Sequence, residues 1–318
     1  MEVPRSAGAA PEAPPRPAPA DEHRHPPGGE QLWNESWYFD VISRDQRIGA
    51  YVRLGLTPNL GLSWITAMVC GPGRPTVAVV DGQAPLPDGE QLVVTSGDRQ
   101  IELNCLSELQ VFQVRVTGAG AEYREAAALL RGEAGTPVPV GLDLTWETAG
   151  QPYAYRRTTR YEIPCCAVGT LRIGDEEVAL AGTGQRDHSW GVRDWWSAEW
   201  MWSAGSLEDG ERLHGLVFRL PGRPPLGVGY RQPAQGGIHD ARRVTAAEEA
   251  GPDGLITRAR IGIDELDLEV TPLAFGPLRI EAPDGRVSEF PRAMCRLTAA
   301  DGRSGVAWVE WNRNRSLS

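Results

Sequence analysis

Short apolar runs, in which hydrophobic side chains recur at every second residue, make up most of this chain from Trp33 onward. This period of two is that of a strand with one buried face, and the runs are too short for most helices. Several of them are separated by Asp-Gly or Gly-Asp pairs, at residues 174–175, 209–210, 284–285 and 301–302. Such pairs form the tight turns of antiparallel hairpins. The pattern therefore predicts an all-β chain of antiparallel strands.

The expected strands fall throughout the chain, with one short helical run inside residues 123–130. They cover residues 37–42, 48–56, 62–69, 92–95, 101–106, 111–117, 140–146, 168–173, 200–207, 213–220, 256–263, 266–270, 278–281, 294–298 and 306–311. So many strands must close or stack to hide their edges, and two tandem β-barrels do this. We expect one domain over residues 31–174 and a second over residues 175–318.

Residues 1–30 are dominated by proline, alanine and glycine and contain almost no large apolar side chain. Such a segment buries too little surface to offset the entropy lost on ordering. We therefore expect a disordered tail. His23 and His25 stand two apart in it, a spacing that in a flexible tail is more often solvated sequence than a metal pair.

Charge and composition exclude several classes of function. The formal net charge is −10, which disfavours nucleic acids and anionic membrane surfaces as partners. All 32 basic residues are arginine, so Schiff-base chemistry, a catalytic lysine and a P-loop lysine are excluded. The sequence shows neither a bilayer-spanning apolar run nor a secretory signal, and we expect a cytoplasmic protein without stable membrane insertion. Its oligomeric state stays open.

The five cysteines indicate neither zinc nor redox chemistry, because none has the Cys-x-x-Cys spacing. Cys165 and Cys166 are adjacent and would point to opposite faces of a strand. We interpret them as two small buried hydrophobic residues in a reduced protein.

The densest chemical signal lies between Gly182 and Trp202. Five of the eleven tryptophans and one of the five histidines fall there, beside carboxylates and guanidinium groups. Polar groups rimmed by aromatic faces are typical of a pocket for an apolar, possibly cationic, species. We expect the functional site in this window.

On an extended strand, His188 and Trp190 share one face and Asp187 lies on the other. Asp187 and His188 can face one cavity only if a bulge or turn intervenes, and Gly182 or Gly191 would make such a kink inexpensive. The alternative is that Asp187 and His188 form a polar plug that satisfies backbone groups near a barrel mouth.

Other polar groups lie on apolar faces. His214 aligns with leucine and phenylalanine on the following strand, which suits either a hydrogen-bonded core histidine or a cavity wall. Glu35 shares its face with Trp33 and Trp37, so we expect an arginine partner, with Arg193 as the candidate, or a raised pKa. A second alternative is a two-histidine, one-carboxylate iron site; it would use His188, His214 and either Asp187 or Asp194.

Two stretches carry a family resemblance: Trp-Asn-Glu-Ser-Trp-Tyr-Phe-Asp at residues 33–40 and Gly-Thr-Gly-Gln-Arg-Asp-His-Ser-Trp-Gly-Val-Arg-Asp-Trp at residues 182–195. With them the chain resembles the carotenoid 1,2-hydratase (hydroxyneurosporene synthase) and AttH-like group of tandem lipocalin-like proteins, most closely an actinobacterial branch. The resemblance implies two lipocalin-like barrels and a cofactor-free hydration of an isoprenoid double bond. An acid protonates the alkene, a tertiary cation forms against aromatic faces, and water adds.

The resemblance also implies roles for individual residues. Asp187, His188 and Trp190 match the Asp-His-x-Trp element of the group, as acid, as the residue that orients the acid or accepts the proton, and as the wall that stabilises the cation. The surrounding residues are expected to bind substrate: Glu35, Trp37, Arg193, Asp194, Trp195, Trp200, Trp202 and His214.

The continuation Arg193-Asp194-Trp195 belongs to the closer branch and not to the carotenoid enzymes, and relatives in the wider group are associated with cyclisation or isomerisation of apolar natural products. We therefore expect a cofactor-independent hydratase, cyclase or isomerase without a metal, acting on a hydrophobic, isoprenoid-like small molecule. The alternative is a non-catalytic carrier of apolar small molecules.

Overall fold

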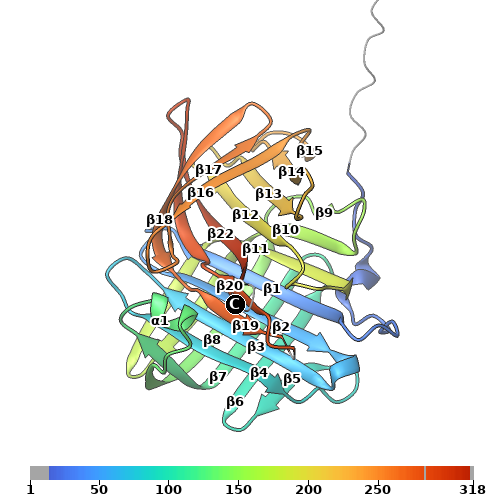
Figure 1. Cartoon of the computed structure of the whole chain (residues 1–318), viewed down its shortest axis with the longest axis vertical. Coiled ribbons are helices and arrows are strands. Elements are labelled where there is room, and N and C mark those ends of the chain that lie inside the picture. The colour runs from blue at the N-terminus through green and yellow to red at the C-terminus, as the bar shows by residue number, and fades with distance from the viewer. Residues whose placement is uncertain (1–13, 283, 316–318) are drawn as a thin grey trace, which may run out of the picture.

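The computed structural model of the chain describes residues 14–282 and 284–315, and nearly all of its regular structure is strand (Figure 1). Two large curled sheets lie against each other, which confirms the predicted all-β, tandem lipocalin-like architecture. Every strand pairing within them is antiparallel, in agreement with the hairpin turns expected from the sequence.

The first sheet is a closed barrel. Its strands follow the order β4-β3-β2-β1-β11-β10-β8-β7-β6-β5, and β4 also pairs with β7, which joins the two sides. The short strand β9 pairs with β10. The strands are β1 (Trp33–Ser43), β2 (Gly49–Thr57), β3 (Leu62–Cys70), β4 (Thr76–Ala84), β5 (Leu92–Ser96), β6 (Arg99–Ser107), β7 (Val111–Tyr123), β8 (Thr136–Thr148), β9 (Tyr153–Ala154), β10 (Arg160–Ile173) and β11 (Glu176–Val192).

The second sheet is curled in the same way but is joined at its ends by packing rather than by pairing. Its order is β15-β14-β13-β12-β22-β21-β18-β17-β16, and β16 packs against β13 and β14. The hairpin of β19 and β20 continues from the end of β22. The strands are β12 (Glu199–Leu207), β13 (Arg212–Arg219), β14 (Leu226–Gln232), β15 (His239–Asp240), β16 (Val244–Ala250), β17 (Ile256–Ile263), β18 (Leu266–Phe275), β19 (Leu278–Glu281), β20 (Val287–Phe290), β21 (Ala293–Ala299) and β22 (Ser304–Arg315).

Each sheet encloses an apolar core, and a third core lies in the seam between the two sheets. Inward-facing valines, leucines and aromatic residues of alternate positions fill the first barrel, and a smaller set fills the second sheet. The seam core is built from both sheets: Tyr38, Ile42, Tyr51, Met68, Cys70, Ala78, Trp202, Ala204, Met294 and Trp308. Strands β1, β2 and β11 therefore have two buried faces, one toward the barrel interior and one toward the seam.

The chain changes sheet later than the sequence predicted. We expected the boundary between residues 174 and 175, but β11 pairs along its length with β10 and β1 of the first sheet. Gly174, with φ of 58°, forms the tight turn that joins β10 to β11 within that sheet. The crossing occurs in the connection between Val192 and Glu199, so the Asp-His-x-Trp element belongs to the first barrel.

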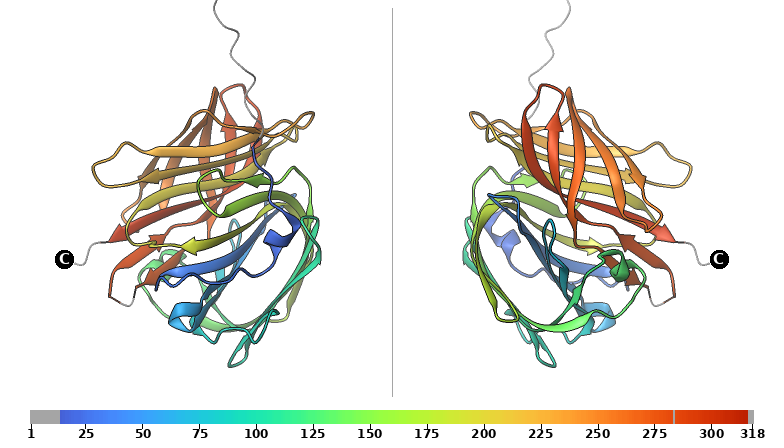
Figure 2. Two further views of the ribbon diagram at one scale, coloured as in Figure 1. Left: turned by 90° about the vertical axis from the view of Figure 1, so that its right-hand side faces the viewer. Right: turned by 90° about the vertical axis from the view of Figure 1, so that its left-hand side faces the viewer.

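The prediction of a disordered tail is wrong for residues 14–30, while residues 1–13 lie outside the described residues. Residues 19–22 form a 3₁₀ helix, η1 (Pro19–Glu22), and the segment lies against the first barrel (Figure 2). Glu22 is only 1% exposed and is ion-paired to the buried Arg186. Composition missed this order because the segment is held by a few particular contacts, among them the ion pair of Glu22, and by the burial of Pro14 and Pro17.

The short helical run expected inside residues 123–130 is present as the helix α1 (Ala127–Leu130), and β7 extends to Tyr123 before it. A further 3₁₀ helix, η2, covers Pro58–Leu60. The list of expected strands lacked β4, β9, β11, β14, β15, β16 and β20, although residues 186–192 of β11 were expected to be extended. β9 and β15 are only two residues long. Within the described part of the chain, each helix is far too short to cross a bilayer.

Candidate functional site

One face of β11 lines the interior of the first barrel, and the other lies against the seam between the two sheets. Its register with β1 is continuous from Trp33 opposite Val192 to Phe39 opposite Arg186, so no bulge interrupts the alternation. Arg186, His188 and Trp190 accordingly face the barrel interior, while Asp187 faces the seam between the sheets. The sequence-predicted acid and its predicted partner His188 therefore lie on opposite sides of one strand.

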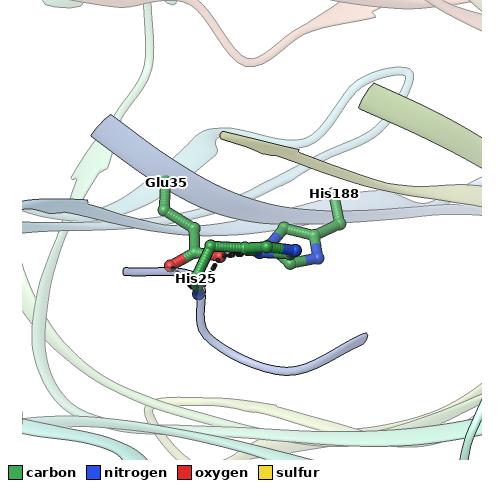
Figure 3. A group of neighbouring side chains, drawn as sticks. All are labelled: His25, Glu35 and His188. Atoms are coloured by element: carbon green, nitrogen blue, oxygen red, sulfur yellow. Dashed lines mark hydrogen bonds and ion pairs between the residues drawn. The ribbon is translucent and has the colours of Figure 1, made fainter. Parts of the chain in front are cut away.

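The barrel-side group joins β1 and β11 to the N-terminal segment (Figure 3). Oε1 of Glu35 lies 2.7 Å from Nδ1 of His25 and 3.0 Å from Nε2 of His188. The backbone N–H of His25 also donates to both oxygens of Glu35, at 3.0 and 3.1 Å. Glu35 thus pairs with two histidines, and the predicted partner Arg193 instead donates to the carbonyl of Trp190.

Aromatic rings and a second ion pair surround this group. Trp37 stacks on His188 with ring centroids 4.4 Å apart, and Trp190 stacks on His25 at 3.8 Å. Next to them, Nη1 of Arg186 donates to the two oxygens of Glu22 at 2.7 and 2.9 Å. Burial lowers the pKa of His188, whereas Glu35 opposes that shift. For Glu35, hydrogen bonds from His188 and His25 outweigh the effect of burial and lower its pKa.

The seam-side group is centred on Glu162, whose side chain is fully buried. Its oxygens accept from Nε of Arg160 at 2.8 Å, Nε1 of Trp202 at 3.0 Å, Nε2 of Gln185 at 3.1 Å and the hydroxyl of Tyr155 at 3.3 Å. Burial raises the pKa of Glu162, but Arg160 and the other donors outweigh it, so the pKa lies below its ordinary value. Glu162 is therefore a fixed negative charge in the seam.

Asp187 shares the arginine of that group. Nη2 of Arg160 donates to Oδ2 of Asp187 at 2.8 Å. Burial raises the pKa of Asp187 to about 7, the charge of Glu162 adds to this shift, and Arg160 opposes it. Asp187 is thus an ion-paired carboxyl group whose pKa burial holds above its ordinary value.

A third carboxyl group, Asp40 of β1, lies in the same seam. Its Oδ1 accepts from the backbone N–H of Gln185 at 2.8 Å and its Oδ2 accepts from the hydroxyl of Tyr38 at 2.9 Å. Asp40 is 1% exposed. Burial raises its pKa to about 8, although the hydrogen bonds from Gln185 and Tyr38 and the charge of Arg292 oppose that shift. Asp40 is therefore largely protonated at neutral pH.

Asp40 and Gln185 line a cleft of about 500 Å³ that opens between the two sheets. This volume is in the range of pockets for small molecules. Apolar side chains from both sheets share the walls with glycines of β11, β12 and β22. The apolar and glycine lining comprises Ile42, Cys165, Gly184, Ala204, Gly205, Leu207, Gly210, Gly305, Val306, Ala307 and Trp308. Charged walls are contributed by Arg44, Glu208 and Arg212.

The remaining predicted residues are distributed over the seam and its surroundings. Trp202 and His214 belong to the seam group, where Nε2 of His214 lies 2.5 Å from the hydroxyl of Tyr155 and burial lowers the histidine pKa to about 4. Trp200 donates to Oε1 of Glu310 at 2.8 Å. Asp194 and Trp195 lie in the connection between β11 and β12. Oδ1 of Asp194 is 3.2 Å from Nη1 of Arg286, and Cζ of Arg53 lies 4.3 Å from the ring centroid of Trp195.

Because His188 and His214 lie in different groups, the alternative iron site built from both is not formed. Sequence reasoning also missed Asp40, Glu162 and Gln185. Asp40 stood inside the quoted stretch at residues 33–40, and its alternation with Tyr38 would have placed it opposite the apolar face of Phe39. Gln185 stood inside the quoted stretch at residues 182–195, but the partners of Glu162 and Gln185 come from several elements: Tyr155 after β9, Arg160 of β10, Trp202 of β12 and Tyr230 of β14.

A family profile described as a domain of unknown function, DUF7064, matches residues 18–315. No curated protein matches the sequence. Among solved structures, a Nitrosomonas europaea protein described as an AttH has a TM-score of 0.64 and 15% identity, with 98% of each chain covered. Kievitone hydratase from Nectria haematococca has a TM-score of 0.60 and 12% identity, covering 88% of this chain and 89% of that one. The protein CghA has a TM-score of 0.54 and 12% identity, with 90% and 89% covered. These likenesses show a shared fold.

Proposed function

The chain belongs to the DUF7064 family, and from this premise we propose that it is a cofactor-independent acid–base enzyme acting on an apolar small molecule in the cleft between its two sheets. The observation that carries the proposal is Asp40, a residue of the cleft lining whose buried carboxyl group has its pKa raised to about 8. A hydratase with the same fold, kievitone hydratase, supports the reaction class.

The proposed chemistry begins with proton transfer from Asp40 to one carbon of a substrate double bond. The other carbon becomes a carbocation, and Asp40 becomes a carboxylate. Addition of water to the cation and return of one water proton to Asp40 completes a hydration. Attack by a second double bond forms a ring and a new carbocation, which loses a proton to Asp40 to give the cyclised product. Loss of a different proton from the first cation to Asp40 gives isomerisation. In each case Asp40 is protonated again at the end, so no co-reactant other than water is required.

The fixed charge of Glu162 supports this chemistry from behind the cleft. It is linked to Asp40 through Gln185, whose side chain donates to Glu162 and whose backbone donates to Asp40. A negative charge in a buried seam stabilises a nearby carbocation and keeps the proton on Asp40 until substrate binds. Pairs of carboxyl groups held in different protonation states are a common arrangement of acid–base sites.

Asp187, the acid implied by the family resemblance, is the second candidate donor, because it lies in the same seam and is held by Arg160. His188 and Trp190 face the barrel interior, so a substrate in the cleft reaches neither ring. We propose that the carotenoid-like roles of His188 and Trp190 do not transfer to this chain. The apolar part of the cleft lining still favours an isoprenoid-like or related hydrophobic substrate.

The test is to incubate the protein with organic extracts and a panel of isoprenoids and to analyse the products by mass spectrometry. Hydration adds the mass of one water, and cyclisation or isomerisation changes retention at constant mass. Asp40→Asn keeps the shape of the side chain, and we expect it to lower turnover by about 10²–10⁴-fold, the usual contribution of a general acid. The matched control is Asp143→Asn, an exposed carboxyl of β8 paired with Arg115, which should retain full turnover. Full turnover in Asp40→Asn would contradict the proposal.

The second candidate is a non-catalytic carrier, favoured by the four hydrogen bonds that satisfy Glu162 within the protein. Tight binding of an apolar compound that is recovered unchanged, with equal affinity in the wild type and in Asp40→Asn, would establish this function instead.

A further inference from the structure

Three ligand-type side chains meet on the barrel side of β1 and β11: His25 and Glu35, which are ten residues apart in the sequence, and the distant His188. One ring nitrogen from each of His25 and His188 and an oxygen of Glu35 all lie within 4.8 Å of one another (Figure 3). Glu35 and His188 are each 1% exposed, and the side chain of His25 is 21% exposed. Two imidazoles and one carboxylate form a donor set that binds transition-metal ions in many proteins.

Both ring nitrogens of His188 face hydrogen-bond acceptors, so in a neutral ring one nitrogen has no hydrogen to donate to its partner. Nδ1 lies 2.6 Å from the backbone carbonyl oxygen of Asp21, and Nε2 lies 3.0 Å from Oε1 of Glu35. Both of these partners are acceptors, and the Tyr161 hydroxyl, 3.4 Å from Nδ1, donates to Glu22 instead. A neutral imidazole has a single N–H to donate. With the proton on Nδ1, the lone pair of Nε2 faces a carboxylate oxygen. A cation between Nε2 and Oε1 would satisfy both groups.

His25 repeats this arrangement and shares the same supporting residue. Its Nδ1 lies 2.7 Å from Oε1 of Glu35, and its Nε2 lies 3.8 Å from Oδ1 of Asp21. Asp21 therefore faces the outer nitrogen of both histidines, with its carbonyl oxygen toward His188 and its carboxylate toward His25. Metal-binding histidines are commonly oriented in this way, because an acceptor at one ring nitrogen fixes the lone pair of the other.

We propose that His25, Glu35 and His188 bind a divalent transition-metal ion that fastens the N-terminal segment to the first barrel. The site is separate from the seam cleft, and the inference does not depend on the proposed function. Two nitrogen donors select an ion such as Zn²⁺ over Mg²⁺ and Ca²⁺, which prefer all-oxygen sites. Stacking of Trp37 on His188 and of Trp190 on His25 holds both rings in place.

The binding test uses the full chain without a histidine tag, treated with a chelator and dialysed. Calorimetric titration with Zn²⁺ should give one ion per chain, and Mg²⁺ at the same concentration should give no binding. His25→Gln should weaken Zn²⁺ binding by at least about 10²-fold, because it removes one of three ligands at a partly exposed position that the fold tolerates. Glu35→Gln tests the same site from β1. His23→Gln, on an exposed histidine of the same segment, should leave the affinity unchanged.

A second experiment measures whether the metal ion holds the N-terminal segment against the first barrel. Zn²⁺ should slow amide hydrogen exchange in residues 14–30 of the wild type and of His23→Gln, and should leave the exchange of His25→Gln unchanged. The proposal is overturned if the wild type and His25→Gln bind Zn²⁺ equally, or if Mg²⁺ competes at equal concentration. It is also overturned if Zn²⁺ binds without slowing exchange in the segment, or if no Zn²⁺ binds and histidine NMR shows a protonated His188 ion-paired to Glu35.

Discussion

Three carboxyl groups share one seam but differ in what their neighbours donate to them. Glu162 receives four side-chain hydrogen bonds, one of them from Arg160, and is stabilised as an anion. Asp40 receives one from a backbone N–H and one from a hydroxyl, and no cation lies within hydrogen-bonding distance of it among the described residues. Burial therefore raises the pKa of Asp40. For Glu162, the charge of Arg160 and the other hydrogen-bond donors outweigh burial and lower the pKa. The presence or absence of one cationic donor, Arg160, therefore distinguishes the ionised Glu162 from Asp40.

The raised pKa of Asp40 has a consequence for stability. Between its unfolded pKa near 4 and its folded pKa of about 8, the folded chain holds a proton that the unfolded chain has lost. This group therefore makes the free energy of unfolding fall with rising pH, by up to about 1.4 kcal/mol per pH unit. Asp40→Asn removes the slope, so the variant should gain stability relative to the wild type between about pH 5 and about pH 7.5.

Urea unfolding of both proteins at the two pH values measures this change. The other titratable groups are common to the two chains and cancel in the difference. Asp143→Asn, the exposed control, should give a difference from the wild type that varies little over the same interval. A pH-independent difference between Asp40→Asn and the wild type would show that Asp40 is ionised in the folded chain.

For single residues, the sequence predicted which face of a strand each side chain occupies but not what surrounds it. Alternation placed Asp187 and His188 on opposite faces, and the continuous register agrees. It could not say that both faces of β11 are buried, because that depends on the second sheet, which packs on one of them. For Glu35, Arg193 was the expected partner, and the actual partners are His25, ten residues before it, and His188 on β11.

Among the elements, the N-terminal segment shows how few contacts can order a stretch of poor composition. Glu22 is buried against Arg186 and also accepts from the hydroxyl of Tyr161 at 2.6 Å. The backbone of Pro15 accepts from the N–H of Ala154 on β9. Composition reports the average apolar content of a segment, whereas this segment is held at particular residues, so its order was not predictable from composition.

Glu22→Ala should destabilise the protein strongly. It leaves the guanidinium of Arg186 buried in the barrel without its counter-charge, which typically costs about 3–5 kcal/mol. The loss is measurable as a lower urea midpoint at an unchanged slope. The matched control is Glu176→Ala, which breaks the half-exposed ion pair with Arg74 and should cost far less.

A second variant separates the charge from the packing. Arg186→Met in the Glu22→Ala background removes the unpaired charge and should recover part of the lost stability. A double variant less stable than Glu22→Ala would mean that the arginine side chain contributes by packing against Phe112 and not through its ion pair.

The strands themselves were the most predictable elements, because alternation is a local property. β2, β3, β12, β13 and β17 lie within one or two residues of their expected bounds. The sheet to which a strand belongs is not local. The turn at Gly174 has the same sequence signature whether it joins two strands of one sheet or two domains, and this ambiguity moved the expected boundary.

For the whole molecule, the seam makes the two sheets one structure. Nε1 of Trp308 on β22 donates to the backbone oxygen of Val41 on β1 at 3.1 Å, and the hydroxyl of Tyr51 on β2 donates to the backbone oxygen of Gly276 at 2.8 Å. Arg292 lies over the rings of both Tyr38 and Tyr51, at 4.5 and 4.4 Å. A tandem pair of barrels is visible in the sequence, but this dependence of one on the other is not.

Shared contacts of this kind predict that the sheets unfold together. Trp308→Ala removes a buried ring from the seam and should cost about 3–5 kcal/mol, as large-to-small substitutions in cores do. Trp146→Ala removes a ring that lies only in the core of the first barrel. If unfolding is one cooperative transition, both variants raise amide hydrogen exchange in β21 and β22 of the second sheet, because those amides then exchange through global unfolding. Faster exchange confined to the first barrel in Trp146→Ala would instead mean that each sheet opens alone. In that case the cleft containing Asp40 would be an interface between two independently stable halves, and substrate could enter by their separation.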